Sequence, residues 1–142
     1  MRKSAYIAAL LGLAYLLSQA PGTLEQTPEP DSLAEQVTDA YEQQQSDVQV
    51  RGQGVVIKLL PDDTQGSRHQ KFILRLASGQ TLLVAHNIDL APRIDALRVT
   101  DYVGFYGEYE WNNQGGVLHW THHDPQGRHL DGWLSHNGKI YQ

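Results

Sequence analysis

Residues 48–60 read VQVRGQGVVIKLL, and this stretch gives the strongest indication of the fold. Hydrophobic side chains alternate with polar ones from Val48, glycines interrupt at Gly52 and Gly54, and an apolar run then resumes. Alternation is typical of a half-buried strand, and glycine inside a strand indicates a bulge or a sharp bend. We therefore expect one long first strand that bends at its glycines.

Four more strands and a final hairpin are expected to follow. The strands cover residues 70–76, 81–86, 101–111 and 117–123. A loop with one helical turn, residues 87–97, separates the third strand from the fourth, and Asn137-Gly138 indicates a hairpin near the C-terminus. This order is that of an oligonucleotide/oligosaccharide-binding (OB) barrel. We expect an all-β domain over residues 48–142 with one short N-terminal helix: a small five-stranded OB-like barrel plus a C-terminal hairpin.

The first 22 residues have the features of an export signal. Arg2 and Lys3 precede an apolar run of 13 residues, 5–17. A membrane-spanning helix needs about 20 such residues, so the run fits the core of a signal peptide better. Small residues follow, and cleavage after Gly22 is favoured. We expect residues 1–22 to be the signal peptide of a protein exported to the periplasm or cell envelope, with an uncleaved anchor as the alternative.

Residues 23–47 are expected to form an acidic linker and a short helix, because they hold seven acidic residues and no basic one. Asp31 or Ser32 can cap a helix over about residues 32–45, whose thin apolar stripe would pack on the barrel. Residues 48–142, in contrast, hold nine acidic and nine basic residues. A neutral domain behind an acidic arm is a poor electrostatic match for duplex nucleic acid.

Histidine is abundant in the chain, whereas cysteine is missing. The lack of cysteine excludes disulfides, thiolate metal sites and cysteine nucleophiles. All seven histidines lie within residues 48–142, and their protonation below about pH 6.5 would make the domain cationic. Candidate chemistry is therefore sought among the histidines.

Residues 116–129, GVLHWTHHDPQGRH, contain four of the seven histidines. Side chains alternate along a strand, so His119 and His123 share one face, and a proline turn can bring His129 back towards them. Imidazoles with a carboxylate are ligands expected for a divalent transition metal such as zinc. We therefore consider a metal site on His119, His123 and His129. The alternatives are a structural hydrogen-bonded network and metal-free acid–base chemistry.

The expected barrel also has a candidate binding face. Tyr102 and Tyr106 share the outer face of the fourth strand, where aromatic rings can stack on bases or sugar rings. Arg68, His69 and Lys71 add hydrogen-bond donors and positive charge. As an alternative, the N-terminal helix covers this face.

These residues support three hypotheses of function. The first is a non-catalytic binding module for a flexible polymer, either single-stranded nucleic acid or a glycan. The second is a metal-dependent hydrolase of the phosphodiesterase or nuclease kind. Three histidines would hold the metal, and Asp124 or Glu108 would act as the catalytic base or orient a metal ligand. The third is a structural envelope protein that docks a partner through its N-terminal helix.

The chain from about Gly54 to Gln142 carries six short motifs: Leu59–Asp63, Ser67–Gln70, Ala85–Asp89, Gly107–Trp111, His119–Pro125 and His129–Trp133. In these motifs the chain resembles an uncharacterised bacterial family, domain of unknown function 3465. The resemblance implies a small exported bacterial protein and implies no activity.

A second likeness concerns Gly54-Val-Val and Asn87-Ile-Asp-Leu-Ala-Pro92, which are similar to segments in the barrel of staphylococcal-type thermonucleases. The resemblance would make Asp89 a calcium-binding residue. Arg93, however, stands where that family has an acidic residue, and Val84 where it has the catalytic arginine. The likeness therefore supports the barrel topology and gives little support to nuclease activity.

Overall fold

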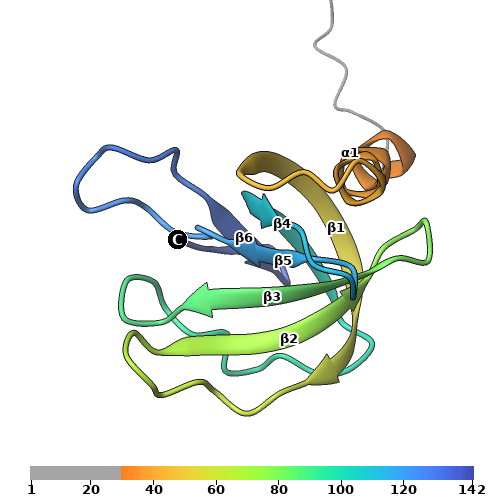
Figure 1. Cartoon of the computed structure of the whole chain (residues 1–142). Coiled ribbons are helices and arrows are strands. Elements are labelled where there is room, and N and C mark those ends of the chain that lie inside the picture. Colours follow the sequence, from red (N-terminus) through yellow and green to blue (C-terminus); the bar gives the residue numbers. More distant parts are fainter. Residues whose placement is uncertain (1–29) are drawn as a thin grey trace, which may run out of the picture.

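The computed structural model of the protein describes residues 30–142, which form one helix and seven strands (Figure 1). The elements are α1 (Pro30–Glu42), β1 (Val48–Leu59), β2 (His69–Arg75), β3 (Thr81–Asn87), β4 (Tyr102–Glu110), β5 (Val117–His119), β6 (Trp133–His136) and β7 (Lys139–Tyr141). The expected signal peptide and residues 23–29 of the linker lie outside the described residues. Within residues 30–142, no helix has the length and apolar character needed to cross a membrane.

Five of the strands close into a barrel. They follow one another in the order β1-β2-β3-β5-β4, and β4 pairs again with β1. Neighbouring strands are antiparallel, apart from β3 and β5, which run parallel. The hairpin of β6 and β7 extends the sheet from β4. This arrangement confirms the expected OB-like barrel with a C-terminal hairpin.

β1 closes the barrel because it pairs with two strands along its length. Its residues 48–55 pair with β4, and residues 55–59 pair with β2. A Cβ atom at Gly52 would lie 2.7 Å from Cζ of Phe105, and one at Gly54 would lie 2.9 Å from a backbone carbonyl oxygen of β2. Only glycine therefore permits the close approach at these two positions. The long, curved first strand expected from the sequence is present (Figure 1).

The interior of the barrel is filled by side chains from alternate strand positions. The buried strand residues include Val50, Val56, Phe72, Leu74, Leu82, Val84, Val103, Phe105, Leu118 and Leu134. Asn137 and Gly138 both have positive φ angles, 49° and 76°, as a tight turn between β6 and β7 requires. The burial of the apolar side chains is the main force that favours the folded state.

The helix α1 packs beside β1 (Figure 1). Its Val37 and Ala40 are buried in the core. It begins at Pro30, two residues before the expected start, because proline fits the first turn of a helix. It ends at Glu42 rather than near residue 45, because Gln44 adopts a φ of 52°. The apolar stripe of the helix is thus used to cover the barrel, as expected.

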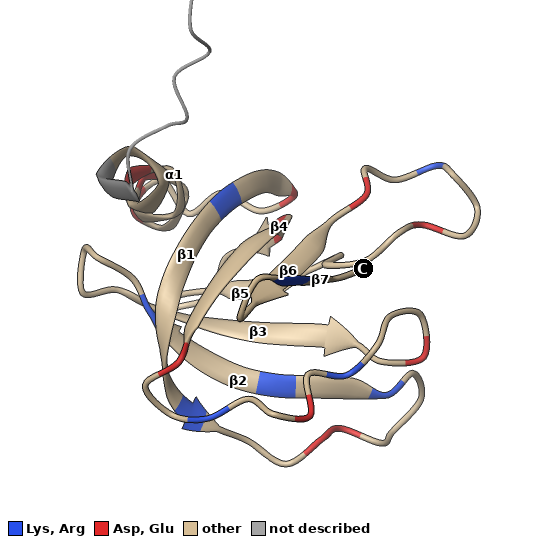
Figure 2. Ribbon diagram, turned by 180° about the vertical axis from the view of Figure 1, so that it is seen from behind, with Lys and Arg blue, Asp and Glu red and all other residues tan. Residues whose placement is uncertain are grey.

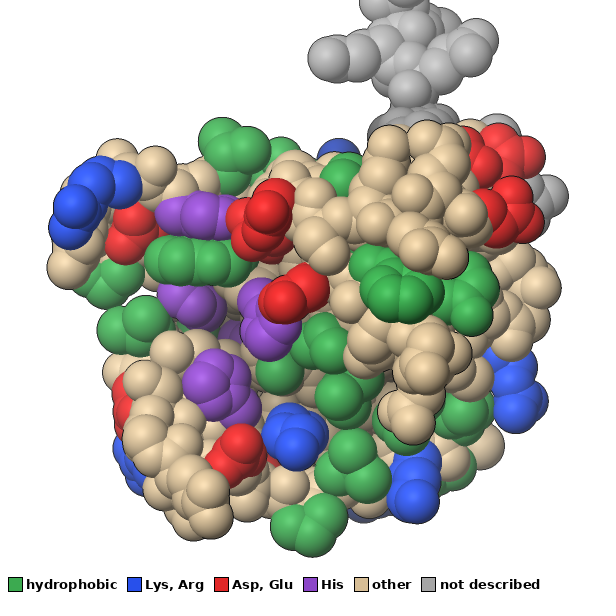
Figure 3. All heavy atoms as spheres, in the orientation of Figure 1, with side chains coloured by type: hydrophobic (Ala, Val, Ile, Leu, Met, Phe, Trp, Pro, Cys, Tyr) green, Lys and Arg blue, Asp and Glu red, His purple; other side chains and the backbone are tan. Residues whose placement is uncertain are grey.

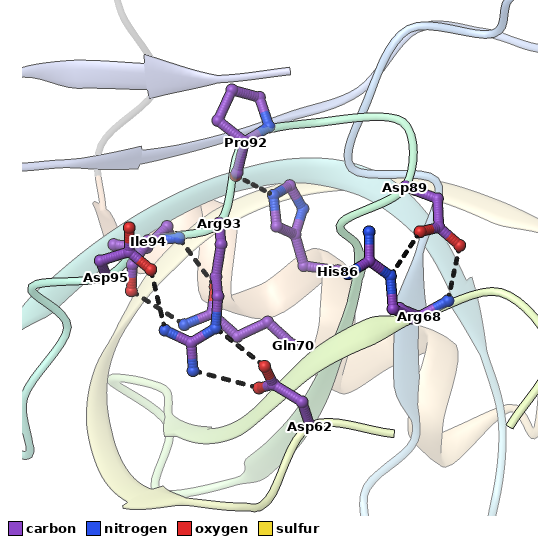
Figure 4. A network of polar contacts seen from close by, with 9 residues as sticks. All are labelled: Asp62, Arg68, Gln70, His86, Asp89, Pro92, Arg93, Ile94 and Asp95. Atoms are coloured by element: carbon purple, nitrogen blue, oxygen red, sulfur yellow. Dashed lines mark hydrogen bonds and ion pairs between the residues drawn. The ribbon is translucent and has the colours of Figure 1, made fainter. Parts of the chain in front are cut away.

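The crossover between β3 and β4, residues 88–101, forms turns in place of the expected helical turn. Its central residue, Ile94, is buried, and both of its backbone groups bond to the side-chain amide of Gln70 at 2.9 Å (Figure 4). The N–H of Ile94 is thus taken by a side chain, and its C=O also accepts a long turn hydrogen bond from the N–H of Leu97 at 3.4 Å. Gln70 therefore attaches the crossover to the barrel.

Replacing Gln70 by alanine would leave the N–H of Ile94 without a partner in the interior, and its C=O with only the N–H of Leu97 at 3.4 Å. We expect the free energy of unfolding to fall by about 2–4 kcal/mol, measured by urea denaturation. The control is Gln53→Ala, at an exposed position of β1, which should change it by less than about 0.5 kcal/mol. Equal stability of the two variants would contradict this role of Gln70.

Candidate functional site

A groove of about 310 Å³ lies on the outer surface, where the ends of β3 and β5 separate. It is lined by His69, Ala85, Asn87, Leu90, Glu108, Glu110, His119, Trp120 and His122. Figure 3 shows that histidine side chains (purple) gather on this face of the molecule, with acidic side chains (red) beside them. The lining combines an aromatic ring with several hydrogen-bonding groups, which is typical of a ligand site.

The register of the strands explains why the surface is hollow there. Ala85 of β3 faces outward next to Lys71, its partner on β2. On its other side, the parallel register of β3 and β5 brings it alongside His119, which in turn pairs with Glu108 of β4. Because Ala85 carries only a methyl group, the longer side chains around it stand above it. Ala85 therefore forms the floor of the groove.

The groove opens where β5 ends, and β5 is shorter than the strand predicted from the sequence. The expected strand covers residues 117–123, whereas β5 ends at His119 and Trp120 has a φ of 54°. A bulky residue in this left-handed region is strained, so the surrounding structure must hold it there. Gly132 contributes, because a Cβ atom on it would overlap the carbonyl oxygen of Trp120. The chain leaves the sheet at this point and forms the loop 120–132.

Trp120 forms one wall of the groove, between two imidazole rings. Its ring stacks on that of His129, with centroids 3.9 Å apart and 7° between the planes. His122 is tilted against it, with a centroid distance of 5.3 Å. His122 is buried, and its Nδ1 donates to the carbonyl oxygen of His123 at 2.7 Å. These contacts fix the orientation of the tryptophan ring.

His129 joins the loop 120–132 to the barrel. Its Nδ1 donates to the carbonyl oxygen of Leu130 at 2.8 Å, and its Nε2 donates to the carboxylate of Glu108 on β4. Burial by itself would lower the pKa of His129, but its hydrogen bonds with Leu130 and Glu108 outweigh burial and raise the pKa. Both ring nitrogens donate, which is the pattern of a charged imidazolium.

The three histidines predicted to share a metal ion face three different carboxylates. The pairs are His129 with Glu108, His119 with Glu110 at 3.2 Å, and His123 with Asp131 at 2.9 Å. Across residues 30–142, no group of three or more His, Asp and Glu side chains is arranged to hold a metal ion. The predicted ligand set is therefore not brought together, because each ring is drawn to a carboxylate of its own.

Asp124 organises the loop 120–132. Its carboxylate accepts hydrogen bonds from the backbone N–H groups of Gln126, His129 and Arg128, at 2.8–2.9 Å. These bonds lower the pKa of Asp124. The two residues predicted as catalytic bases thus have structural partners, Asp124 within the loop and Glu108 on His129.

The predicted binding residues at the start of β2 have different surroundings. His69 lines the groove, and Lys71 lies beside its floor. Arg68 instead binds Asp89 through its Nε at 2.7 Å and through its backbone N–H at 2.8 Å (Figure 4). These two bonds lower the pKa of Asp89. The aspartate that would correspond to a calcium ligand is thus held by an arginine.

The two predicted tyrosines lie on the outer face of β4, as expected, but neither lines the groove. Tyr102 is 70% exposed and lines a separate hollow beside β1 and the end of β2. Tyr106 packs on Trp133 with a centroid distance of 6.4 Å, and Arg51 covers the Trp133 ring at 5.4 Å. Tyr102 and Tyr106 therefore lie in two different surroundings and do not form one aromatic binding face.

Asn87, Leu90 and Trp120 line the groove but are not among the site residues predicted from the sequence. One feature of the sequence could have indicated Asn87: it follows Ala85 by two residues and therefore lies on the same face of β3. Their closeness to Trp120 depends on the parallel pairing of β3 with β5. That pairing joins segments more than thirty residues apart, which local patterns do not reveal.

Two other histidines belong to the interior. The Nε2 of His86 donates to the carbonyl oxygen of Pro92 at 3.0 Å (Figure 4), and its Nδ1 accepts from the Thr121 hydroxyl at 2.8 Å. His86 is fully buried, and this burial lowers its pKa to about 4. His136 is bonded to Asp101 at 2.7 Å, which lowers the pKa of Asp101. These rings support the fold and not the groove.

The fold and the groove define the chain as a small OB-like β-barrel with a candidate ligand site on its outer surface. The chain belongs to the family described as Protein of unknown function (DUF3465), which it matches over residues 24–142. The resemblance seen in the six sequence motifs is thereby confirmed. A search of the curated proteins finds no match.

We expect His86 to remain neutral in the folded protein well below pH 6.5. The unfolded chain binds a proton at His86 first, so this residue lowers the free energy of unfolding as the pH falls from 6.5 to about 4. The loss amounts to about 3 kcal/mol once both states are protonated. NMR titration of the assigned His86 ring should give a midpoint near pH 4, and a midpoint near 6.5 would contradict the buried, neutral ring.

His129 should behave in the opposite way, because its pKa is raised by folding. Its contribution to stability is complete below about pH 6.5 and disappears as the pH rises through its folded pKa. We expect His129→Gln to lower the free energy of unfolding by about 1–2 kcal/mol at pH 5.5, and by less at pH 8.5. The matched control is His123→Gln, an exposed pair with Asp131, for which a change below about 1 kcal/mol is expected. If His129→Gln lowers the free energy of unfolding equally at both pH values, the ion pair between His129 and Glu108 is contradicted.

Proposed function

We propose that this protein is a binding module that holds a flexible polymer across the outer face of its barrel, in the groove between β3 and β5. The single observation that supports this most strongly is the lining of the groove. It places an immobilised aromatic ring, an amide, imidazoles and carboxylates around a small alanine floor. OB-type barrels bind oligonucleotides and oligosaccharides on their outer strands and loops, so the location is also suitable.

Binding accounts for the groove better than hydrolysis does. The candidate bases Asp124 and Glu108 are each occupied by loop-forming contacts. The three histidines of the hydrolase hypothesis are paired one by one with carboxylates. Groups that are fixed in this way form a rigid surface for recognition, which reduces the entropy lost on binding.

The docking hypothesis for α1 has less support than the groove. The apolar residues of the helix, among them Val37 and Ala40, are buried against the barrel. Its outer face presents acidic and polar side chains. The setting that we propose for the binding module is the periplasm or cell envelope, and this rests on the sequence of residues 1–22.

Filling the floor of the groove should weaken binding. We expect the protein to bind short oligosaccharides or single-stranded oligonucleotides in calorimetric titrations, and Ala85→Leu to raise the Kd roughly tenfold by occupying the floor. The matched control is Ala77→Leu at an exposed turn outside the groove, which should leave the Kd unchanged. Unfolding curves establish that both variants are folded. If neither class of polymer binds at pH 5.5 and pH 7.5, the proposal fails.

A further inference from the structure

We infer that the polymer held in the groove is a glycan rich in hydroxyl groups, and not a single-stranded nucleic acid. This inference rests on the proposed function and narrows it. The charges of the groove and the hydrogen-bonding groups of its lining both favour a glycan.

Glu110 carries the exposed negative charge of the lining, because Glu108 is held by His129. Glu108 and Glu110 contribute two carboxylates, and no lysine or arginine is among the lining residues. Of the neighbouring cations, the Arg68 guanidinium is bound to Asp89, and Lys71 lies beside the floor on β2. Arg68, Lys71 and Arg75 follow one another with no acidic residue between them, and Figure 2 shows a basic position (blue) on β2. None of the three is among the residues that line the groove, so the lining itself has no basic stripe. Phosphate-dependent binding needs such a stripe.

Glu110 is the group best suited to meet a ligand. Its side chain is 60% exposed and lies 3.2 Å from the Nε2 of His119. Glu108, in contrast, is 23% exposed and is held by His129. A carboxylate has about four lone-pair positions, so Glu110 keeps acceptor capacity that a ligand with O–H or N–H donors can use.

Hydrogen-bond polarity distinguishes a sugar hydroxyl from the phosphodiester backbone of a nucleic acid. A phosphodiester only accepts hydrogen bonds and carries a negative charge, so next to Glu110 it finds repulsion and no proton to share. A sugar hydroxyl both donates and accepts. It can donate to the carboxylate and accept from the amide nitrogen of Asn87, whose oxygen is already bonded to the N–H of Asp89 at 2.9 Å. A charge-assisted bond of this kind is stronger than a neutral one.

The decisive variant is Glu110→Gln, because it moves the two binding reactions in opposite directions. It removes the negative charge but keeps the shape of the side chain. A panel of neutral and amino-sugar oligosaccharides is first titrated against the wild type at pH 7.5. For each oligosaccharide that binds, we expect Glu110→Gln to raise the Kd about fivefold to tenfold. For a short oligothymidylate, loss of the repulsion would strengthen any binding that occurs. The matched control is Glu35→Gln on α1, an exposed glutamate outside the groove, which should change neither Kd.

Salt dependence gives a second, independent measurement. Glycan binding should change by less than about twofold between 50 and 200 mM NaCl, whereas binding through several phosphates weakens by an order of magnitude or more. Wild-type binding of oligothymidylate that falls steeply with salt, with no binding of any oligosaccharide in the panel, would overturn the inference and leave the groove as a polymer site. If the wild type binds neither probe, both this inference and the proposed function fail. Glycan binding weakened by Glu110→Gln and insensitive to salt supports both.

Discussion

The double pairing of β1, with β4 along its first part and with β2 along its last, is the constraint on which the other parts of the molecule depend. It turns an open sheet into a barrel and leaves β3 and β5 to meet as parallel neighbours. Two glycines make it possible, because at Gly52 and Gly54 other residues approach to distances that exclude a side chain. Once the barrel is closed, the register of every strand is fixed, and with it the residues that face the solvent at each point.

A layer of polar contacts outside the barrel then shapes the groove. Asp124 folds the loop 120–132 with three amide bonds, and the charged ring of His129 fastens it to Glu108 while stacking on Trp120. The same charged side chains would destabilise the fold inside the barrel, because an unpaired buried charge loses its hydration. His86 shows the other solution, since it is buried and neutral with one donor and one acceptor partner. Histidine thus serves two opposite purposes, according to whether carboxylates or apolar neighbours surround it.

The sequence correctly predicts that histidines contribute to the candidate site. It does not predict which residues the fold brings together there. The concentration of histidine after the fourth strand does mark the groove, and His69 and His119 line it. The expected metal set assumed that the fifth strand continues to residue 123, whereas the strand stops at His119 and the rings separate. Tyr102 and Tyr106 do face outward as their alternation predicts, but the curvature of the barrel and the contact with Trp133 separate them from the groove.

The sequence by itself determined the elements: the strands by their alternation, the turns by Asn137-Gly138 and similar pairs, the bent first strand by its glycines, and the family by short motifs. These are local properties, readable within a few residues. Only the tertiary structure decided which histidine meets which carboxylate and where Ala85 leaves space, because those contacts join residues far apart in the chain. The left-handed backbone at Trp120 belongs to the second group. No local preference favours it, and it is held by Gly132 and by the imidazole rings of His122 and His129, which the fold of the loop 120–132 brings against Trp120.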